Sequence, residues 1–318
     1  QVEVGFFMRK ISIIGSGSWA QALTKVIVNR EILVKYRKSV NKSKFTSKTI
    51  RFTNHFRDLG KSYFIFLAIP SQSIRQNLVE LRNKTNFYNP VFIICSKGVE
   101  QRTDQLMSEV VLDIFPNSRI VILSGPNFSS ELIGNKPSAT VLSSLNKKSL
   151  LEVSELFSLE KLRVYFNSDI IGTQLGGAMK NVIAIACGFA KGKNLGENAK
   201  AAIITRGISE IVKLGVKMGA KRKTFYGLSG IGDLTLTCSS LKSRNTKFGF
   251  DLAKGGKLDN LKGDCTLEGF ESCESICKLG QKYEVELPLC NSVKKLINGA
   301  NPKLVISNLL SRPLQFEN

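Results

Sequence analysis

Near the start of the chain, three consecutive segments decide the fold: Ile11-Ser-Ile-Ile14, Gly15-Ser-Gly-Ser-Trp-Ala20 and Gln21-Ala-Leu-Thr-Lys-Val-Ile-Val28. They read as a buried parallel strand, a glycine turn and a helix, in that order. Gly15 permits the tight turn, Gly17 lets the backbone approach a pyrophosphate, and the small Ala20 lets the helix pack closely on the strand. Because the helix N-terminus supplies free N–H groups, we predict that this turn binds a dinucleotide diphosphate.

Short apolar runs and helical segments alternate after this unit. The runs that resemble strands are Ile32–Val34, Tyr63–Ile69, Val91–Cys95 and Ile120–Leu123. Ser71–Leu81 and Thr103–Phe115 have helical periodicity, and this alternation indicates a doubly wound α/β sheet. The polar, lysine-rich segment between Val34 and Tyr63 is short for a helix and strand pair, and its pattern does not place its elements.

The pattern of apolar residues changes after about Phe166, where long stretches of helical periodicity replace the short runs that resemble strands. Asp169–Lys191 is the clearest of them. We therefore expect an α/β fold with an N-terminal Rossmann-like doubly wound domain at residues 8–168, followed by an all-helical substrate-binding domain at residues 169–318. Gln1–Phe7 precede Met8 and are left out of this prediction.

Composition and charge bound the possible functions. The 318 residues include 46 Lys and Arg against 25 Asp and Glu, a formal charge of +21, and 42% of residues are hydrophobic. Such a chain buries a sizeable core, which excludes a disordered polycationic tail. The charge leaves a nucleic-acid-binding protein as an alternative, but no helix-turn-helix, RNP or zinc-finger signature accompanies the lysines, and we expect no nucleic-acid partner.

Cysteine usage and hydropathy indicate the compartment. No apolar run reaches the roughly 18 residues that span a bilayer, and the N-terminus lacks a basic segment followed by a long apolar one. The chain has an odd number of cysteines and no CxxC pair, which fits a reducing compartment. They are Cys95, Cys187, Cys238, Cys265, Cys273, Cys277 and Cys290. We expect a soluble cytoplasmic protein with no membrane span.

Metal chemistry is not expected. Cys273 and Cys277 are four residues apart in a helical stretch, and the chain has a single histidine, His55, in a polar segment. This is no ligand set for zinc, so the two cysteines are interpreted as helix packing. Acid–base chemistry then falls to Lys, Asp, Glu, Cys or Tyr.

The end of the second strand bears on the identity of the cofactor. NAD-binding proteins usually place an acidic residue there, about 20 residues after the glycines, to hold the ribose 2′-hydroxyl. This chain has Arg37 at that spacing, followed by Lys38. A guanidinium beside a lysine suits the 2′-phosphate of NADP, so the sequence favours NADP with NAD tolerated. The alternative is that both are ordinary surface cations.

Two lysines are candidates for the chemistry. Lys97 follows the run Val91–Cys95 at the carboxyl end of a strand, where open α/β sheets bind ligands, and the Gly-Pro turn after Leu123 brings Gly125 and Asn127 toward the same crevice. Lys180 interrupts the apolar helix among small residues, and partial desolvation lowers the pKa of such a lysine toward the range useful for proton transfer. The alternative for Lys180 is a lysine that snorkels to the surface.

Downstream residues suit a phosphorylated substrate. Asp233 supplies a carboxylate in a glycine-rich turn, and Ser243-Arg-Asn245 opens a helix that runs through Leu252. Free backbone donors combined with a guanidinium bind a phosphate monoester well. Ser243 is also explained as a purely structural N-cap.

At this point the chain resembles the bacterial biosynthetic type of NAD(P)-dependent glycerol-3-phosphate dehydrogenases. The matching blocks keep the family's order and spread over most of the chain. They are Gly15–Leu23, Ser96–Glu100, Gly125–Glu131, Leu175–Gly188, Asn198–Glu210, Gly227–Cys238, Ser243–Asn245 and Leu267–Gly269. The sequence departs from the pattern at Ala20, usually glycine, at Asn127, often serine, at Ser129, often alanine, and in a shortened segment after Arg37.

The resemblance implies an enzyme that interconverts sn-glycerol 3-phosphate and dihydroxyacetone phosphate for glycerophospholipid synthesis. By position, Lys180 matches the catalytic lysine and Lys97 the lysine that contacts substrate and cofactor. The remaining substrate-binding positions are Gly125, Asn127, Asp233, Ser243, Arg244 and Asn245. The positions that contact NADP or NAD, besides Gly15 and Gly17, are Ser18, Trp19, Arg37, Ser129, Arg244, Thr266 and Glu268. A homodimer is the assembly considered.

The expected chemistry is reduction of the substrate's C2 carbonyl by hydride transfer. The developing alkoxide needs a cation and a proton donor, and Lys180 supplies both as an ammonium. We expect Lys97 and Asp233 to fix orientation and the helix start at Ser243 to hold the phosphate. A β-hydroxyacid dehydrogenase is the rival within Rossmann enzymes, and the phosphate-suited Ser243-Arg-Asn245 argues against it.

Overall fold

Strands of the N-terminal half form one sheet. The computed structural model describes residues 10–28, 30–45, 49–86, 90–256, 258–262 and 266–311, so Gln1–Phe7, Met8 and Cys265 lie outside the described residues. Within these ranges the sheet has the order β3-β2-β1-β4-β5-β6-β7-β8. The strands are β1 (Lys10–Ile14), β2 (Ile32–Lys35), β3 (Ile50–Thr53), β4 (Ser62–Leu67), β5 (Val91–Ile94), β6 (Arg119–Ser124), β7 (Ser138–Ser143) and β8 (Leu162–Asn167).

The sheet is parallel except where β6 meets β7. The chain runs outward from β1 to β3 and then returns to β4 on the other side of β1, so the topological switch point lies between β1 and β4. Ligands of doubly wound sheets bind outside the carboxyl ends of the strands at this point. The predicted N-terminal fold class is confirmed.

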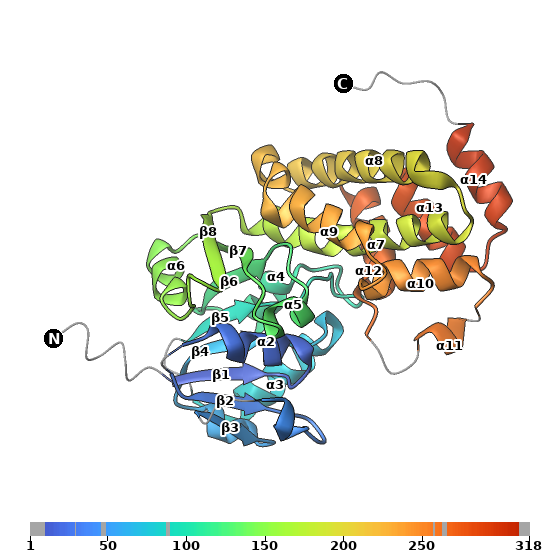
Figure 1. The fold of residues 1–318 in the computed structure, drawn as a ribbon. Coiled ribbons are helices and arrows are strands. Elements are labelled where there is room, and N and C mark those ends of the chain that lie inside the picture. The colour runs from blue at the N-terminus through green and yellow to red at the C-terminus, as the bar shows by residue number, and fades with distance from the viewer. Residues whose placement is uncertain are drawn as a thin grey trace.

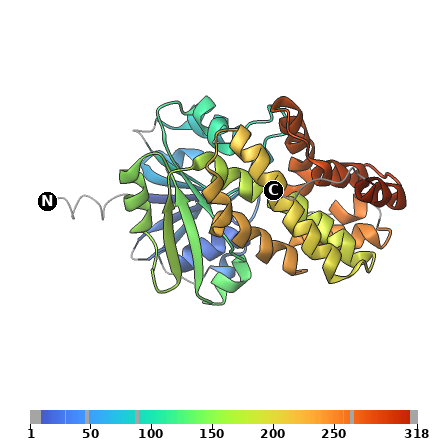
Figure 2. The same cartoon turned by 90° about the horizontal axis from the view of Figure 1, so that it is seen from above.

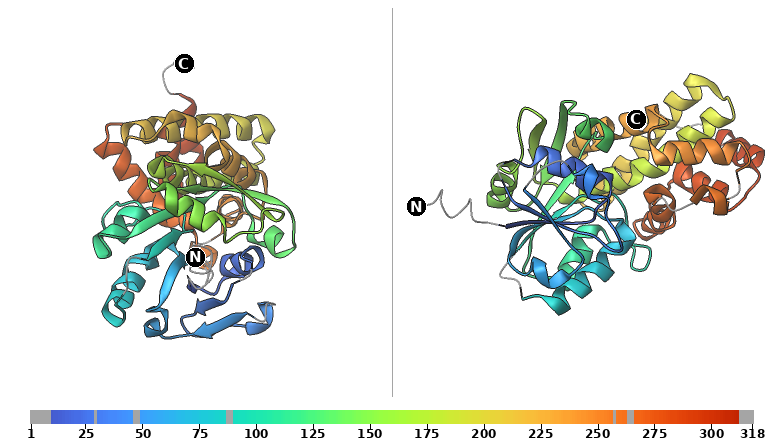
Figure 3. Two further views of the ribbon diagram at one scale, coloured as in Figure 1. Left: turned by 90° about the vertical axis from the view of Figure 1, so that its left-hand side faces the viewer. Right: turned by 60° about the horizontal axis from the view of Figure 1, so that its bottom comes forward.

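Helices cover both faces of the sheet (Figure 3). On one face α2 (Ser18–Val26), α5 (Ser129–Ile133) and α6 (Lys147–Ser154) contribute to an apolar core with strand residues such as Ile13. On the other face α3 (Ile74–Lys84) and α4 (Met107–Ile114) enclose a second core that includes Ile65. Buried side chains on both faces explain why the strands read as near-continuous apolar runs.

The strand predictions at Ile32–Val34, Tyr63–Ile69, Val91–Cys95 and Ile120–Leu123 are confirmed as β2, β4, β5 and β6. The helix expected at Thr103–Phe115 begins only at Met107, because Asp104 has a φ of 56° and the backbone turns there before the helix starts. Of the segment that the pattern left unplaced, the structure describes a short turn of 3₁₀-helix at Lys42–Lys44, the edge strand β3 and a second 3₁₀ turn at Phe56–Leu59.

The C-terminal half is helical, and α7 (Ile170–Gly192) runs through its centre (Figures 1 and 2). Around α7 lie α8 (Gly196–Lys217), α9 (Asp233–Ser239), α10 (Arg244–Ala253), α11 (Leu258–Lys262), α12 (Glu268–Lys282), α13 (Pro288–Ile297) and α14 (Pro302–Leu310). Asp169 caps α7, since its Oδ1 accepts from the N–H of Gly172 at 2.8 Å. Cys273 and Cys277 lie on α12 and are buried in the apolar core of the helical half, so their interpretation as packing residues is confirmed.

Helix α7 corrects one expectation. It is long and apolar enough, by length and composition, to cross a bilayer, although the sequence was expected to contain no such run. In the structure 89% of its most apolar window is buried inside the protein. Its apolar composition is therefore explained by its position in the helical core.

Candidate active site

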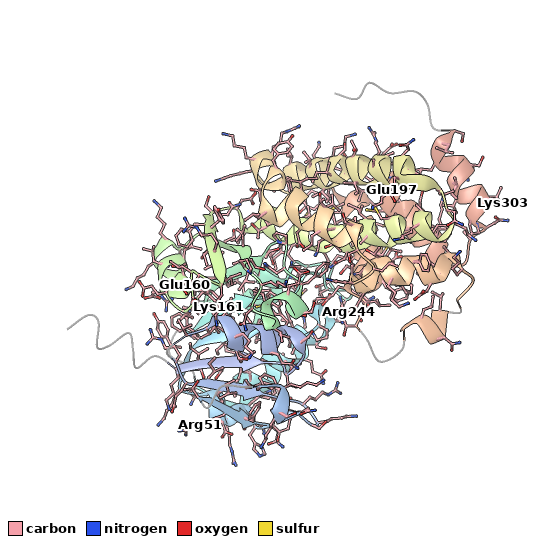
Figure 4. All side chains as sticks on the ribbon, viewed as in Figure 1. Arg51, Glu160, Lys161, Glu197, Arg244 and Lys303 are labelled. Carbon is pink, nitrogen blue, oxygen red and sulfur yellow. The ribbon has the colours of Figure 1, made fainter. Side chains whose placement is uncertain are left out.

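A cavity of about 640 Å³ lies where the carboxyl edge of the sheet meets the helical half. The predicted site residues other than Gly125 all line it: Gly15, Gly17, Ser18, Trp19, Arg37, Lys97, Asn127, Ser129, Lys180, Asp233, Ser243, Arg244, Asn245, Thr266 and Glu268. Gly125 is buried, and its carbonyl accepts a hydrogen bond from Lys97 at 2.9 Å. Arg244 is visible at the junction of the two halves (Figure 4).

The glycine turn after β1 forms one wall. Gly15 has a φ of 119°, and a Cβ there would lie 2.3 Å from the carbonyl oxygen of Ala68. A Cβ on Gly17 would meet nothing within 4 Å, so its exposed backbone faces open space. Helix α2 follows with neither an acidic residue in its first turn nor a side-chain cap. Its first N–H groups are thus available to an anion, as predicted.

Three polar side chains meet at the junction of the sheet and the helices. Asp233, at the start of α9, is 1% exposed, and each of its carboxylate oxygens accepts from a lysine. Lys97 Nζ lies 2.6 Å from Oδ2, and Lys180 Nζ lies 2.6 Å from Oδ1. Lys180 Nζ also donates to Thr237 Oγ1 at 2.7 Å. One buried carboxylate therefore places two ammonium groups at one end of the cavity.

Burial sets the protonation behaviour of Lys180. Its side chain is 9% exposed, and desolvation lowers its pKa to about 8, with Asp233 opposing the shift and Lys97 adding to it. At neutral pH it is mostly an ammonium that gives up its proton far more readily than an ordinary lysine. The snorkelling alternative is wrong for Lys180, because its ammonium pairs with Asp233 inside the protein.

The helix start at Ser243 forms another part of the cavity wall. Ser243 is buried and caps α10, because its Oγ accepts from the N–H of Thr246 at 3.3 Å. Arg244 is exposed, with no hydrogen bond or ion pair to another described residue. Asn245 Oδ1 accepts from the N–H of Gly269 at 3.0 Å, which ties α10 to α12. A serine hydroxyl, a guanidinium and an amide side chain are thus held together at one helix terminus, so the structural N-cap and the phosphate-binding interpretations are compatible.

Glu268 links the two halves at the rim. It begins α12 in the helical half, and one carboxylate oxygen accepts from the N–H of Ser71 at 3.0 Å while the other bonds the Ser71 hydroxyl. Desolvation raises the pKa of Glu268 to about 7, against the hydrogen bonds from Ser71. Arg244 lies close enough to lower that pKa as well.

Several cavity residues escaped the sequence analysis. Lys35 lies at the end of β2, Asn181 donates to the carbonyl of Lys97 at 3.2 Å, and Thr237 holds Lys180. Thr237 is four residues from Asp233 on one helix face, a spacing that was available from the sequence. The hydrogen bond between Ser71 and Glu268 joins residues 197 positions apart, and no local sequence pattern predicts it.

Relatives of known name match nearly the whole chain. Glycerol-3-phosphate dehydrogenase [NAD(P)+] of Parvibaculum lavamentivorans is 35% identical over 328 residues, covering 97% of this chain and 98% of the relative. The enzyme of the same name from Zymomonas mobilis is 37% identical over 324 residues, covering 96% of this chain and 94% of the relative. This chain belongs to the glycerol-3-phosphate dehydrogenase family.

Family models and solved structures agree with this assignment. The models of the N-terminus and the C-terminus of NAD-dependent glycerol-3-phosphate dehydrogenase match residues 35–150 and 169–307. The crystal structure of glycerol-3-phosphate dehydrogenase from Coxiella burnetii has a TM-score of 0.91 at 28% identity, covering 96% of this chain and all of that one. The predicted family and the predicted order of a Rossmann-like half and a helical half are confirmed.

The site of this glycerol-3-phosphate dehydrogenase family member fits a nicotinamide dinucleotide. A side chain at Gly15 would collide with the backbone of Ala68, whereas a Cβ at Gly17 would meet no atom within 4 Å. Free donors at the start of α2 suit a diphosphate, and cations at Lys35 and Arg37 line the cavity at the end of β2. The donor set therefore suits a polyanionic dinucleotide that lies along the carboxyl edge of the sheet.

Proposed function

We propose that this chain reduces dihydroxyacetone phosphate to sn-glycerol 3-phosphate, with NADPH or NADH as the hydride donor, and that it serves glycerophospholipid synthesis in the cytoplasm. The observation that carries the proposal is the carboxylate of Asp233, which holds Lys97 and Lys180 at 2.6 Å beside a cavity with a dinucleotide turn. The names of the relatives and the confirmed family support it.

Lys180 is proposed as the proton donor. When bound, the reduced nicotinamide supplies a hydride to the C2 carbonyl, and the carbonyl oxygen then needs a positive neighbour and a proton. Lys180 is mostly protonated at neutral pH, so its ammonium stabilises the developing alkoxide and then transfers a proton to it. In the reverse direction the neutral amine accepts the proton from the C2 hydroxyl.

Lys97 and Asp233 are proposed to position the reacting groups. Lys97 is fixed between the Gly125 carbonyl and Asp233, so its ammonium has a defined place beside Lys180. Asp233 lies between the two lysines and offsets the repulsion between them. Asn127 donates to the carbonyl of Ala139 at 2.9 Å, and its side-chain oxygen is buried with no hydrogen-bond partner among the described residues.

The phosphate of the substrate is proposed to bind at the start of α10. Ser243, Arg244 and Asn245 line the cavity there, and Arg244, which has no hydrogen bond or ion pair to another described residue, carries a guanidinium suited to a bidentate phosphate contact. Binding energy from this remote group orients the C2 carbonyl without taking part in the bond changes. Gly125, Thr266 and Glu268 stay proposed contacts on the strength of the family resemblance.

Product analysis tests the proposal. The protein is incubated with NADPH and dihydroxyacetone phosphate, and separately with dihydroxyacetone, which lacks the phosphate. We expect sn-glycerol 3-phosphate as the product of the first reaction and little turnover in the second. Equal turnover of both ketones, or a product other than glycerol 3-phosphate, contradicts the proposed substrate and the role of the α10 terminus.

Two organisational statements stay proposals. We propose a division into a dinucleotide-binding domain at 8–168 and a substrate-binding domain at 169–318, supported by the last strand ending at Asn167 and α7 beginning at Ile170. The homodimer considered from the sequence is likewise proposed. Light scattering on the purified protein tests it, and the mass of a single chain at working concentration contradicts it.

A further inference from the structure

Lys35 is a buried lysine that no carboxylate of the described residues contacts directly. It is the last residue of β2, it is 7% exposed, and it lines the cavity. Its Nζ lies 3.8 Å from the centroid of the Phe56 ring. In the described parts of the chain it has no side-chain hydrogen bond and no ion pair.

Such a lysine is costly for the protein. Lysine is almost never fully buried unless it is paired, and an aromatic face compensates only partly for lost hydration. Burial lowers the pKa of Lys35, the neighbouring Arg37 lowers it further, and Glu80 on α3 opposes both. Since Glu80 and Arg37 also line the cavity, the region holds two cations and one acid, with net positive charge.

The position of Lys35 relates it to a dinucleotide. The backbone carbonyl of Lys35 accepts a hydrogen bond from the N–H of Gly15 at 2.9 Å, so the backbone of Lys35 lies beside the turn proposed to hold the diphosphate. Arg37 follows two residues later and is exposed on the same cavity wall. The end of the second strand is where Rossmann folds recognise the adenosine ribose, and a carboxylate there selects the 2′-hydroxyl of NAD. Here the residues from Lys35 to Lys38 include three cations and no acid.

We propose that Lys35 is the specificity-determining residue for the cofactor, and that it forms with Arg37 a two-cation seat for the 2′-phosphate of NADP(H). The phosphate provides the anionic partner that Lys35 lacks, and NAD(H), without that phosphate, leaves the buried cation unpaired. Lys38 is exposed and outside the cavity lining, so the second cation of the seat is Lys35 rather than the lysine next to Arg37. The inference rests on the proposed function and names the cofactor that the site selects.

Calorimetric titration with adenosine 2′,5′-bisphosphate and with adenosine 5′-monophosphate tests the inference on the full chain without turnover. We expect the bisphosphate to bind the unaltered protein at least about 10-fold more tightly, the range of one charge-assisted hydrogen bond. Lys35→Met should remove most of this ratio, whereas Lys35→Arg should keep it. Lys61→Met is the matched control, because Lys61 is exposed just before β4, at the opposite end of the strands.

Thermal unfolding separates a binding role from a structural one. Lys35→Met replaces an unpaired buried cation by an apolar chain of similar length, so the ligand-free variant should unfold at the same temperature or higher. A Lys35→Met variant that keeps the full binding ratio overturns the inference, whether or not its stability has changed. Equal binding of both nucleotides to the unaltered protein overturns it too, while leaving the dehydrogenase proposal standing; no binding of either nucleotide contradicts both.

Discussion

Replacing Asp233 by asparagine tests how the site controls its acid. The carboxylate is 1% exposed and is the partner of Lys97 and Lys180, each at 2.6 Å, so Asp233→Asn removes one negative charge from between two ammonium groups. Asp233 raises the pKa of Lys180, whereas burial and Lys97 lower it. Without the carboxylate, its raising influence is lost while burial and Lys97 still lower the pKa of Lys180, so that pKa falls below its value of about 8.

The size of the effect follows from the fraction of Lys180 that carries the proton. With a pKa of about 8, about 90% of Lys180 is an ammonium at pH 7; loss of an adjacent opposite charge typically lowers a lysine pKa by about 1 to 3, which leaves about 50% to about 1%. Reduction of the carbonyl needs the ammonium, which is present below this pKa and lost as the pH rises through it. Turnover at pH 7 therefore falls by about 2-fold to about 90-fold from protonation alone, and further because the two lysines lose their anchor.

The assay is the pH profile of dihydroxyacetone phosphate reduction. For the unaltered protein the alkaline limb should decline near pH 8; for Asp233→Asn it should decline at lower pH, with activity partly recovered toward acid. Asp251→Asn is the matched control, since it removes a carboxylate from the solvent-facing pair with Lys247 at 2.7 Å on α10. An Asp233→Asn protein with an unshifted profile and normal turnover refutes the reasoning.

The remaining predictions concern the acid, the phosphate and the glycine turn. Lys180→Ala should lower turnover by about 10²-fold or more while dinucleotide binding in titration persists, and near-normal turnover removes Lys180 from the mechanism. Arg244→Ala should raise KM for dihydroxyacetone phosphate far more than it changes kcat, and an unchanged KM contradicts the phosphate role. Gly15→Ala should destabilise the fold by at least about 1 kcal/mol in denaturant titration, because its Cβ would lie 2.3 Å from the Ala68 carbonyl; Gly17→Ala, with nothing within 4 Å, should fold normally and weaken dinucleotide binding instead. The opposite ranking of these two glycine variants in stability contradicts the described turn.

Local patterns in the sequence were enough to predict the parts of the fold with nearly continuous apolar runs. The strand at Ile11–Ile14 and the helix at Asp169–Lys191 are dense in apolar residues because neighbours cover them on all sides. The sequence analysis missed strands β3, β7 and β8, because β3 and β8 are partly exposed and β7 carries serine and threonine among its apolar residues, so the apolar pattern of each is interrupted. Tertiary contacts within the sheet, not local propensity, make them strands.

The same distinction applies to the site. Individual candidates such as Lys97, Lys180 and Asp233 stood out because a strand end, an apolar helix and a glycine turn are unusual places for charge. Their arrangement around one carboxylate could not be predicted from local patterns, because Asp233 contacts Lys97 and Lys180, which lie 136 and 53 positions earlier in the chain. Lys35 was missed for a different reason: the count from the glycines led to Arg37, and only the structure shows that the strand's own last residue is buried in the cavity wall.

The central claim is that the two lysines, the carboxylate and the dinucleotide turn together reduce dihydroxyacetone phosphate. The most direct test follows the nicotinamide absorbance band of the purified protein with this substrate and, in parallel, NADPH or NADH. The account predicts that absorbance falls on addition of substrate, faster with NADPH than with NADH, and that Lys180→Ala nearly abolishes the fall. Constant absorbance with both cofactors, from a protein that still binds adenosine 2′,5′-bisphosphate, contradicts it.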